Sequence, residues 1–153
     1  MNTTYKGKNL QVLLNGKSIA LATSHSLDIT INTADTTTKD SDGKFLQNET
    51  TTIQWSLQSE NLCSFGTDGS DTQTVLDLAL VGTPVTVVFG LVTPLDAVVP
   101  TGGFTVNSTA SDKFAYTGSA IITSISVSAN NGEKATYSVT FTGTGALTKV
   151  TTE

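Results

Sequence analysis

The chain is short of the residues that most often carry chemistry. Its 153 residues include one cysteine, Cys63, and one histidine, His25, which excludes an internal disulfide and leaves no His/Cys set for a metal. Charged residues make up only 14%, and the formal net charge is −5. Nucleic-acid binding requires clustered Lys and Arg that neutralise phosphates, so this balance argues against it. The longest apolar stretch, residues 85–92, is far too short to cross a membrane.

Sequence motifs of enzymes are also missing. The chain contains no Gly-x-Ser-x-Gly and no phosphate-binding glycine loop, and Gly143-Thr144-Gly145 is not followed by the helix that a nucleotide site requires. We expect His25 to be a turn or interface residue and Cys63 to be a small buried filler. Residues 1–8 have basic side chains but no apolar run behind them, so we expect no signal peptide. The sequence therefore predicts no enzyme, no cofactor and no metal.

What the chain has in abundance is threonine, at roughly a fifth of the residues, and this β-branched side chain favours strands over helices. Residues 134–145 show the resulting pattern most clearly. One side of the predicted strand is apolar, with Ala135, Tyr137, Val139 and Phe141. The other side carries hydroxyls and no charge, with Thr136, Ser138, Thr140 and Thr142. A two-residue period of this kind is typical of a half-buried β-strand.

Most other segments repeat this design. Strands are predicted at residues 10–14, 17–23, 26–32, 50–59, 85–91, 114–129 (one long or two short), 134–142 and 146–150. Leu27, Ile29 and Ile31 share one face of their strand, and Ile53, Trp55 and Leu57 share one face of theirs. Asn15-Gly16 predicts a tight hairpin, because both residues tolerate positive φ. The expected fold is mainly β, an antiparallel β-sandwich or barrel.

A single helix is predicted over residues 70–81. Ser70 and Gln73 form a capping box at its start, and Gly82 stands where a left-handed residue ends a helix. Its expected buried stripe consists of Val75, Leu76, Ala79 and Leu80. We expect this helix to pack on the flank of the sheet within one domain that spans residues 1–153.

Two long stretches lack this periodicity, at residues 33–49 and 92–112, and we expect them to be interaction loops. The first resembles a calcium loop at Asp40, Asp42 and Glu49, but Thr38 stands at the first ligand position and no helices flank it. Asp and Gly at these positions also make an ordinary tight turn, which is the interpretation we prefer. A calcium titration would test the alternative.

Several segments, in chain order, resemble the major tail tube proteins of long-tailed bacteriophages. They are residues 16–20 with Ser24, 27–29, 38–43, 52–55 with Leu62, the helix with residues 82–87, and finally 116–118 and 135–145. The resemblance covers most of the chain. It implies a sandwich or barrel with a flanking helix, which assembles into rings, usually of six, that stack into a tube for the phage genome. The same fold occurs in the inner tubes of contractile injection machines.

The resemblance also implies partners and sites. The partners would be other copies of the chain, the tape-measure, terminator and distal tail proteins, and double-stranded DNA that passes without specific binding; no membrane is involved. The location would be the virion tail, with assembly in the host bacterial cytoplasm. The loop at 33–49 and the arm at 1–8 would reach the next ring, with contact candidates Tyr5, Lys39, Asp40, Asp42, Lys44 and Phe45. Thr136, Ser138, Thr140 and Thr142 are the candidates for the lumen face.

Two other functions are compatible with the sequence. One is a different tube, neck or decoration component of a phage or injection machine. The other is a carbohydrate-binding or adhesin β-sandwich, which would need exposed aromatic platforms. The aromatic residues of the predicted strands, such as Trp55 and Tyr137, instead alternate on faces that we expect to be buried.

Overall fold

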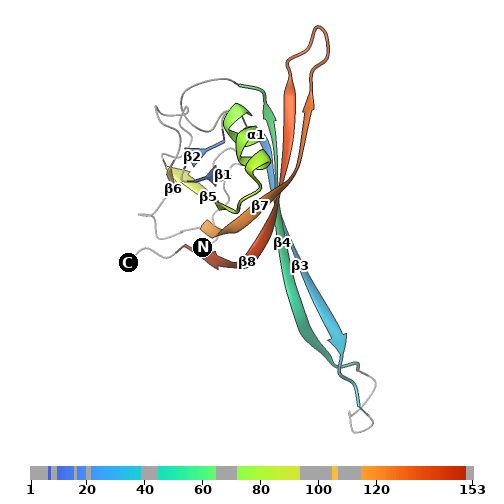
Figure 1. Cartoon of the computed structure of the whole chain (residues 1–153). Coiled ribbons are helices and arrows are strands. Elements are labelled where there is room, and N and C mark those ends of the chain that lie inside the picture. Colours follow the sequence, from blue (N-terminus) through green and yellow to red (C-terminus); the bar gives the residue numbers. More distant parts are fainter. Residues whose placement is uncertain are drawn as a thin grey trace.

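The computed structural model describes residues 7, 10–15, 17–19, 22–38, 45–64, 72–93, 105–106 and 115–150. It contains eight strands and one helix in these parts of the chain (Figure 1). Their bounds are β1 (Leu10–Leu14), β2 (Lys17–Ser18), β3 (Ala22–Asp35), β4 (Asn48–Leu62), α1 (Thr72–Val81), β5 (Val85–Thr93), β6 (Thr105–Val106), β7 (Ala115–Ser128) and β8 (Thr136–Lys149).

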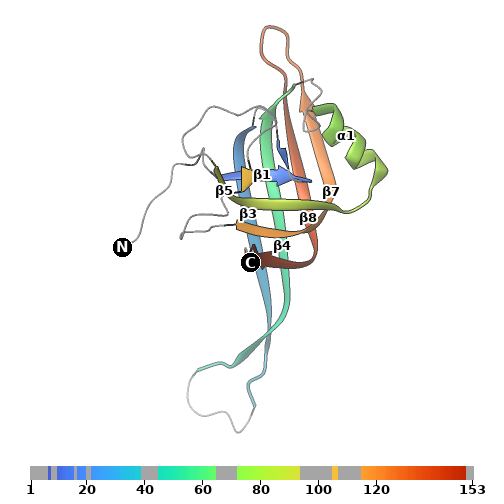
Figure 2. The same cartoon turned by 90° about the vertical axis from the view of Figure 1, so that its left-hand side faces the viewer.

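All the strands belong to one antiparallel arrangement in the order β2-β1-β5-β7-β8-β4-β3, with β6 paired to β5. Residues 115–120 of β7 pair with β5, whereas residues 136–142 of β8 pair with β4. Because β7 and β8 pair with each other along both halves, the sheet bends there and forms two layers. Figure 2 shows β1 and β5 crossing over β3, β4 and β8. The mainly β class with one helix is confirmed.

The path of the sheet runs from β2 to β3, and no pairing between described residues joins these two ends. The molecule is therefore an open sheet folded onto itself. The core fills the space between the two layers. Its members include Val12, Leu14, Trp55, Leu57, Val75, Val85, Val87, Ala120, Tyr137, Val139 and Phe141. The predicted burial of the strand aromatics is confirmed, since Trp55 is 5% and Tyr137 2% exposed.

The first hairpin forms as predicted. Leu14 pairs with Lys17, which leaves a two-residue turn, and Asn15 has φ of 51°. The return strand is shorter than expected, because only Lys17 and Ser18 pair with β1 and the chain enters β3 at Ala22. The long β3 strand then pairs with β4 along its whole length.

Helix α1 ends as predicted but packs with a different stripe. Gly82 has φ of +73°, and its N–H donates to the carbonyl of Leu78. Val75 is fully buried, and Leu78 and Ala79 pack against the core. Leu80, expected in the stripe, is 85% exposed, because it lies roughly 140° around the helix from Val75 at about 100° per residue. Ser70 lies outside the described residues.

Three segments that we expected to lie outside the strands, at residues 33–49, 92–112 and 143–145, are partly or wholly strand where they are described. Residues 33–35 and 48–49 belong to the β3–β4 ladder, and residues 36–38 and 45–47 lie outside it. Residues 92–93 pair with 105–106, and the rest of the 92–112 stretch lies outside the described residues. Strand β8 continues through Gly143 and Gly145 to Lys149. Threonine supports the first ladder despite its polar composition, since it fits pleated strands as well as turns.

Candidate assembly surfaces

One broad sheet face consists of hydroxyl and amide side chains. We call it the polar face: it is the side of β7, β8, β4 and β3 that points away from the core. Each of its central rows crosses four strands by cross-strand pairing, such as Ser126, Ser138, Glu60 and Ser24. The next row contains Ser124, Thr140, Gln58 and Ser26. Side chains that are directly opposite in a ladder share one face, so the rows form a continuous surface.

The four predicted lumen candidates lie together on the polar face. Thr136, Ser138 and Thr142 are exposed, and Thr140 is half-buried. The hydroxyls of Thr142 and Thr123 lie 3.0 Å apart. Their role in a lumen stays a prediction.

The polar face has little charge and no positive charge in the stretch where its four strands pair. Asp28 and Glu60 are its ionisable side chains across residues 24–30, 56–62, 121–128 and 136–142. Two half-open hollows of about 280 and 320 Å³ lie along it, the first lined by Asp28, Thr30, Gln54, Trp55, Ser56, Thr142 and Gly143. Within the described residues, no group of three His, Cys, Asp or Glu side chains could hold a metal. The polar face therefore offers mainly hydroxyl and amide groups for hydrogen bonding.

Both lateral edges of this layer are open in the described parts of the chain. Strand β3 ends the sheet order, so one side of its 14 residues has no strand partner. On the other edge, β7 loses its partner β5 after Ala120, so residues 121–128 pair with β8 alone. Long unpaired edges of this kind are templates for pairing with another chain.

The β3–β4 hairpin extends beyond the core, and the β7–β8 hairpin extends in the opposite direction (Figure 1). Hydrogen bonds hold the described part of the β3–β4 hairpin together as far as residues 36 and 47. The Asn32 amide donates to the Thr52 hydroxyl at 2.8 Å, and the Thr36 N–H donates to the Gln47 carbonyl at 2.8 Å. The Thr37 hydroxyl and N–H hold the pKa of Asp35 below its ordinary value.

An apolar stripe runs along the protruding part of this hairpin. It consists of Ile29, Ile31 and Ile53, which are 53%, 57% and 62% exposed. Ile31 pairs directly with Ile53, and Ile29 pairs with Trp55, so the stripe continues the core-facing side of the sheet. The alternation predicts the correct face for these residues but not their exposure, because it carries no information on where the core ends.

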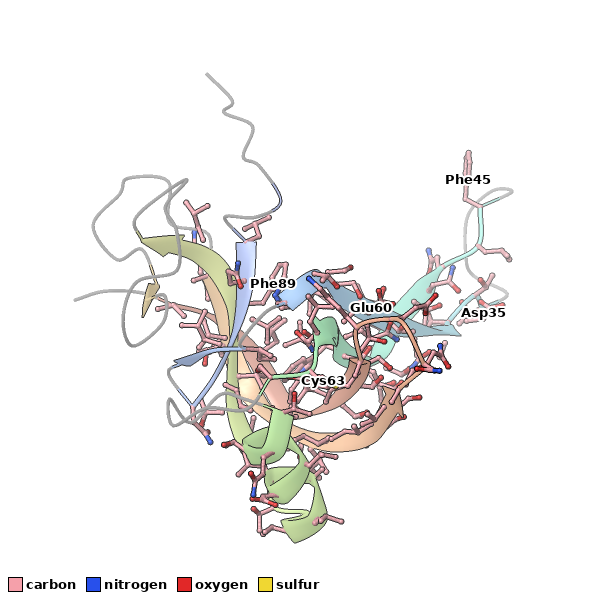
Figure 3. The ribbon with its side chains drawn as sticks, turned by 90° about the horizontal axis from the view of Figure 1, so that it is seen from above. Asp35, Phe45, Glu60, Cys63 and Phe89 are labelled. Carbon is pink, nitrogen blue, oxygen red and sulfur yellow. The ribbon has the colours of Figure 1, made fainter. Side chains whose placement is uncertain are left out.

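The tip of the hairpin is also apolar where it is described. Phe45 is 85% and Leu46 72% exposed, and Figure 3 shows Phe45 pointing away from the ribbon near Asp35, far from the core. The contact candidates Tyr5, Lys39, Asp40, Asp42 and Lys44 lie outside the described residues. Glu49, from the calcium-like pattern, is an exposed residue of β4 opposite Ala34.

His25 lies on the core-facing side of β3, opposite Ser59. It lines a hollow of about 280 Å³ with Leu10, Thr23, Ser24 and Phe89. Neither ring nitrogen has a hydrogen-bond partner among the described residues, and burial lowers the pKa of His25 to about 4.

Cys63 is half-buried and packs against the core, and its N–H donates to the Ala135 carbonyl. The expected filler role of Cys63 fits these contacts, since a thiol packs as a small apolar group.

No helix in the described parts of the chain is long and apolar enough to span a membrane.

Comparison with curated proteins found no match. Residues 95–149 match a family model described as phage tail tube protein.

Solved structures share the fold over nearly the whole chain. The tail of an empty gene transfer agent particle, with C6 symmetry, has a TM-score of 0.73 at 16% identity, covering 96% of this chain and 99% of that chain. The SPP1 tail tube has a TM-score of 0.68 at 12% identity, covering 97% and 81%. The sheath–tube complex of an extracellular contractile injection system has 0.63 at 13%, covering 98% and 95%. The family match and the shared fold confirm the predicted resemblance: the chain has the architecture of a structural tail tube protein.

Proposed function

We propose that this chain is the subunit of a phage-type tail tube, in which copies form rings of six that stack around a channel for DNA. The single observation that carries the proposal is the four-stranded polar face with an open edge on each side. It is supported by the family match over residues 95–149 and by the shared fold.

The open edges favour a ring over a monomer. The outer side of β3 and residues 121–128 of β7 lie on opposite sides of the same layer. When β3 of one copy pairs with β7 of the next, each copy uses two different surfaces, and repetition of such a contact closes a ring. Six copies would follow the C6 symmetry of the gene transfer agent tail. In such a ring both edges are paired, so they no longer offer unpaired backbone groups to other chains.

The polar face suits the wall of the channel. Because double-stranded DNA is densely negative, a wall without Lys or Arg avoids the counterion release that drives nucleic-acid binding. Asp28 and Glu60 add a weak repulsion, and the hydroxyl and amide groups keep the wall hydrated. In this arrangement Thr136, Ser138, Thr140 and Thr142 line the lumen, and α1 lies on the outside.

The remaining parts of the proposal concern contacts and location. The β3–β4 hairpin, including Phe45, and the arm at residues 1–8 reach the next ring. Tape-measure, terminator and distal tail proteins set the length and the ends of the tube. Assembly takes place in the host bacterial cytoplasm, and the product is part of the virion tail.

Electron microscopy of the purified, untagged protein at high concentration tests this function. We expect rings or hollow tubes of uniform width, with six-fold symmetry in end views. A protein that stays monomeric at every concentration, and that is not incorporated into particles when it is produced together with the other tail proteins, would contradict the proposal.

A further inference from the structure

We propose that Asn131 is a site of spontaneous deamidation, at which the turn between β7 and β8 acquires a carboxylate without the help of an enzyme. The chain has two Asn-Gly sequences, Asn15-Gly16 and Asn131-Gly132. Asparagine is one of the thermolabile residues of proteins, and a following glycine leaves its backbone nitrogen least hindered, because it has no Cβ. This inference does not depend on the proposed tube, since it concerns the chemistry of a single chain.

The reaction is intramolecular. The backbone nitrogen of Gly132, after losing its proton to hydroxide, attacks the side-chain carbonyl carbon of Asn131, and the side-chain amide leaves as ammonia. The product is a five-membered cyclic imide. Water then adds to one of the two imide carbonyls and opens the ring, which gives aspartate or isoaspartate. One water is consumed and one ammonia is released, so the sequence needs no oxidant, reductant or cofactor. Because the reacting groups belong to adjacent residues, their effective concentration is high.

The structure leaves the reacting groups accessible at Asn131. Both Asn131 and Gly132 are exposed, and the space around Gly132 is open. Among the described residues, neither of the two takes part in a hydrogen bond. The Gly132 N–H and the Asn131 amide therefore do not have to give up a protein partner before they react.

The turn around these residues is weakly held. The Glu133 N–H donates to the Asn130 carbonyl at 3.2 Å, and Gly132 has φ of +85°, which is the pattern of a type II turn. The β7–β8 ladder ends at the pair Ser128–Thr136, so the turn lies outside it. An exposed turn closed by one long hydrogen bond opens at low cost. Opening lets the side chain rotate towards the backbone nitrogen that attacks it.

The other Asn-Gly sequence is held in place. The Asn15 N–H donates to the Thr86 carbonyl at 2.9 Å, and the side-chain oxygen of Asn15 accepts a hydrogen bond from the Thr86 N–H at 3.3 Å. The side chain that would have to rotate is thus bonded to β5. We expect Asn15 to react only when these bonds break. The structure, and not the dipeptide alone, therefore selects Asn131.

Deamidation changes the charge at the end of the β7–β8 hairpin. The turn carries one acid and one base, Glu133 and Lys134, whose formal charges cancel. A carboxylate at residue 131 makes the turn net negative. The hairpin extends beyond the core (Figure 1), so the new charge lies on the surface. We expect the protein to stay folded and to become more acidic as it ages.

The test is incubation of the dilute natural protein at pH 8.5 and 37 °C, followed by ion-exchange chromatography and peptide mass spectrometry. A parallel sample in concentrated urea removes the fold. Asn131→Gln is the matched variant, because its longer side chain forms the corresponding six-membered ring far more slowly. Asn131→Asp marks the elution of the aspartate product. Trp55 fluorescence checks that each protein is folded.

In the folded protein we expect Asn131 to deamidate on the order of tenfold or more faster than Asn15, because the hydrogen bonds of Asn15 must first break. In urea the two rates should be similar, since glycine follows both residues. The early acidic form should be absent from Asn131→Gln. Similar rates at the two sites in the folded protein would overturn the selection by structure. If Asn131 reacts in urea but stays intact in the folded protein, the turn protects it and the proposed site is wrong.

Discussion

At the scale of single residues, Trp55 packs against β7 and β8, the two strands at which the sheet bends. Its indole lies over β8 and β7, where Gly143 and Gly118 leave room for it, and its Nε1 donates to the Gly145 carbonyl at 3.1 Å. A Cβ on Gly143 would overlap the indole ring, and one on Gly118 would lie 2.6 Å from Cζ2. The two glycines are therefore required by a close approach of side chain to backbone.

We expect Gly143→Ala to destabilise the protein by about 1–3 kcal/mol, the usual range for overpacking a core. Trp55 is the only tryptophan, so urea unfolding followed by its fluorescence reports on the altered site directly. Thr144→Ala, an exposed position of the same strand, is the control and should change stability by no more than about 0.5 kcal/mol. Equal unfolding midpoints for the two variants would contradict the packing argument.

His25 should make stability depend on pH. Its folded pKa of about 4 lies below the ordinary 6.5, so between these values the unfolded chain takes up a proton that the folded chain does not. The contribution is fully present above about pH 6.5 and falls as the pH drops towards 4, by about 3 kcal/mol in total, since each pKa unit corresponds to about 1.4 kcal/mol. Asp35, whose folded pKa is also lowered, loses its contribution only at still lower pH, below its ordinary value of 3.8.

The measurement is urea unfolding at pH 7 and pH 4.5 for the natural protein and for His25→Leu. The variant removes the titrating group and places an apolar side chain next to Leu10 and Phe89. We expect the difference in stability between the two pH values to shrink by about 2 kcal/mol in the variant. The same difference in both proteins would show that another group is responsible.

At the scale of elements, local pattern predicts which way side chains point but not where strands end. The faces of Leu27 and Trp55 follow from alternation, and the structure agrees. The ladder beyond Asn32 is not predicted, because its Thr, Asn and Asp residues are equally common in turns. The continuity of β8 through Gly143 is not predicted either. That glycine makes room for the indole of Trp55, which lies 88 positions earlier in the chain (143 − 55 = 88). Such distant contacts leave no local signal.

Helix α1 shows the same limit. Two different stripes on this helix have helical spacing. The predicted one consists of Val75, Leu76, Ala79 and Leu80, and the observed one consists of Val75, Leu78 and Ala79. Only the position of the sheet decides which of the two is buried. The end of the helix, in contrast, is a local matter and was predictable. Gly82 has a positive φ and open space around it, so its role is purely conformational.

Gly82→Ala should therefore cost about 1–2 kcal/mol through left-handed strain alone. For a chain of this size that corresponds to a fall in Tm of roughly 2–8 °C, measured by circular dichroism on dilute protein. Gly82→Asn is the matched variant and should lose less, because asparagine tolerates this region better. An alanine variant as stable as the natural protein would mean that the helix ends in another conformation.

At the scale of the whole molecule, the candidate site was predictable in part. The hydroxyl face of β8 follows from the sequence, and so does its lack of charge. Its continuation over β7, β4 and β3 needs the sheet order, and the open edges need knowledge of which strands lie outermost. The exposure of the apolar stripe depends on how far the β3–β4 hairpin extends beyond the core. These properties belong to the assembled sheet, so one segment read alone cannot contain them.

The lumen assignment leads to a prediction about DNA passage. Thr140 lies near the middle of the polar face, between Gln58 and Ser124 in the ladder. With six copies per ring, Thr140→Lys would place a band of positive charge in every ring of the channel, and each neutralised phosphate would release counterions. We expect particles with this subunit to eject DNA more slowly at low salt and to recover as the salt concentration rises. The measurement is the rate of DNA release in vitro.

Thr140→Gln is the control for that experiment, because it has a similar reach and no charge. Both variants change a half-buried position, so any loss of tube formation that they share reflects packing and not the lumen. A delay that is confined to the lysine variant and declines steeply with salt identifies the polar face as the wall that DNA touches, since only charge neutralisation has that dependence. Equal ejection rates for the two variants at low salt would contradict the lumen assignment. The polar face would then lie on the outside of the tube, away from the DNA.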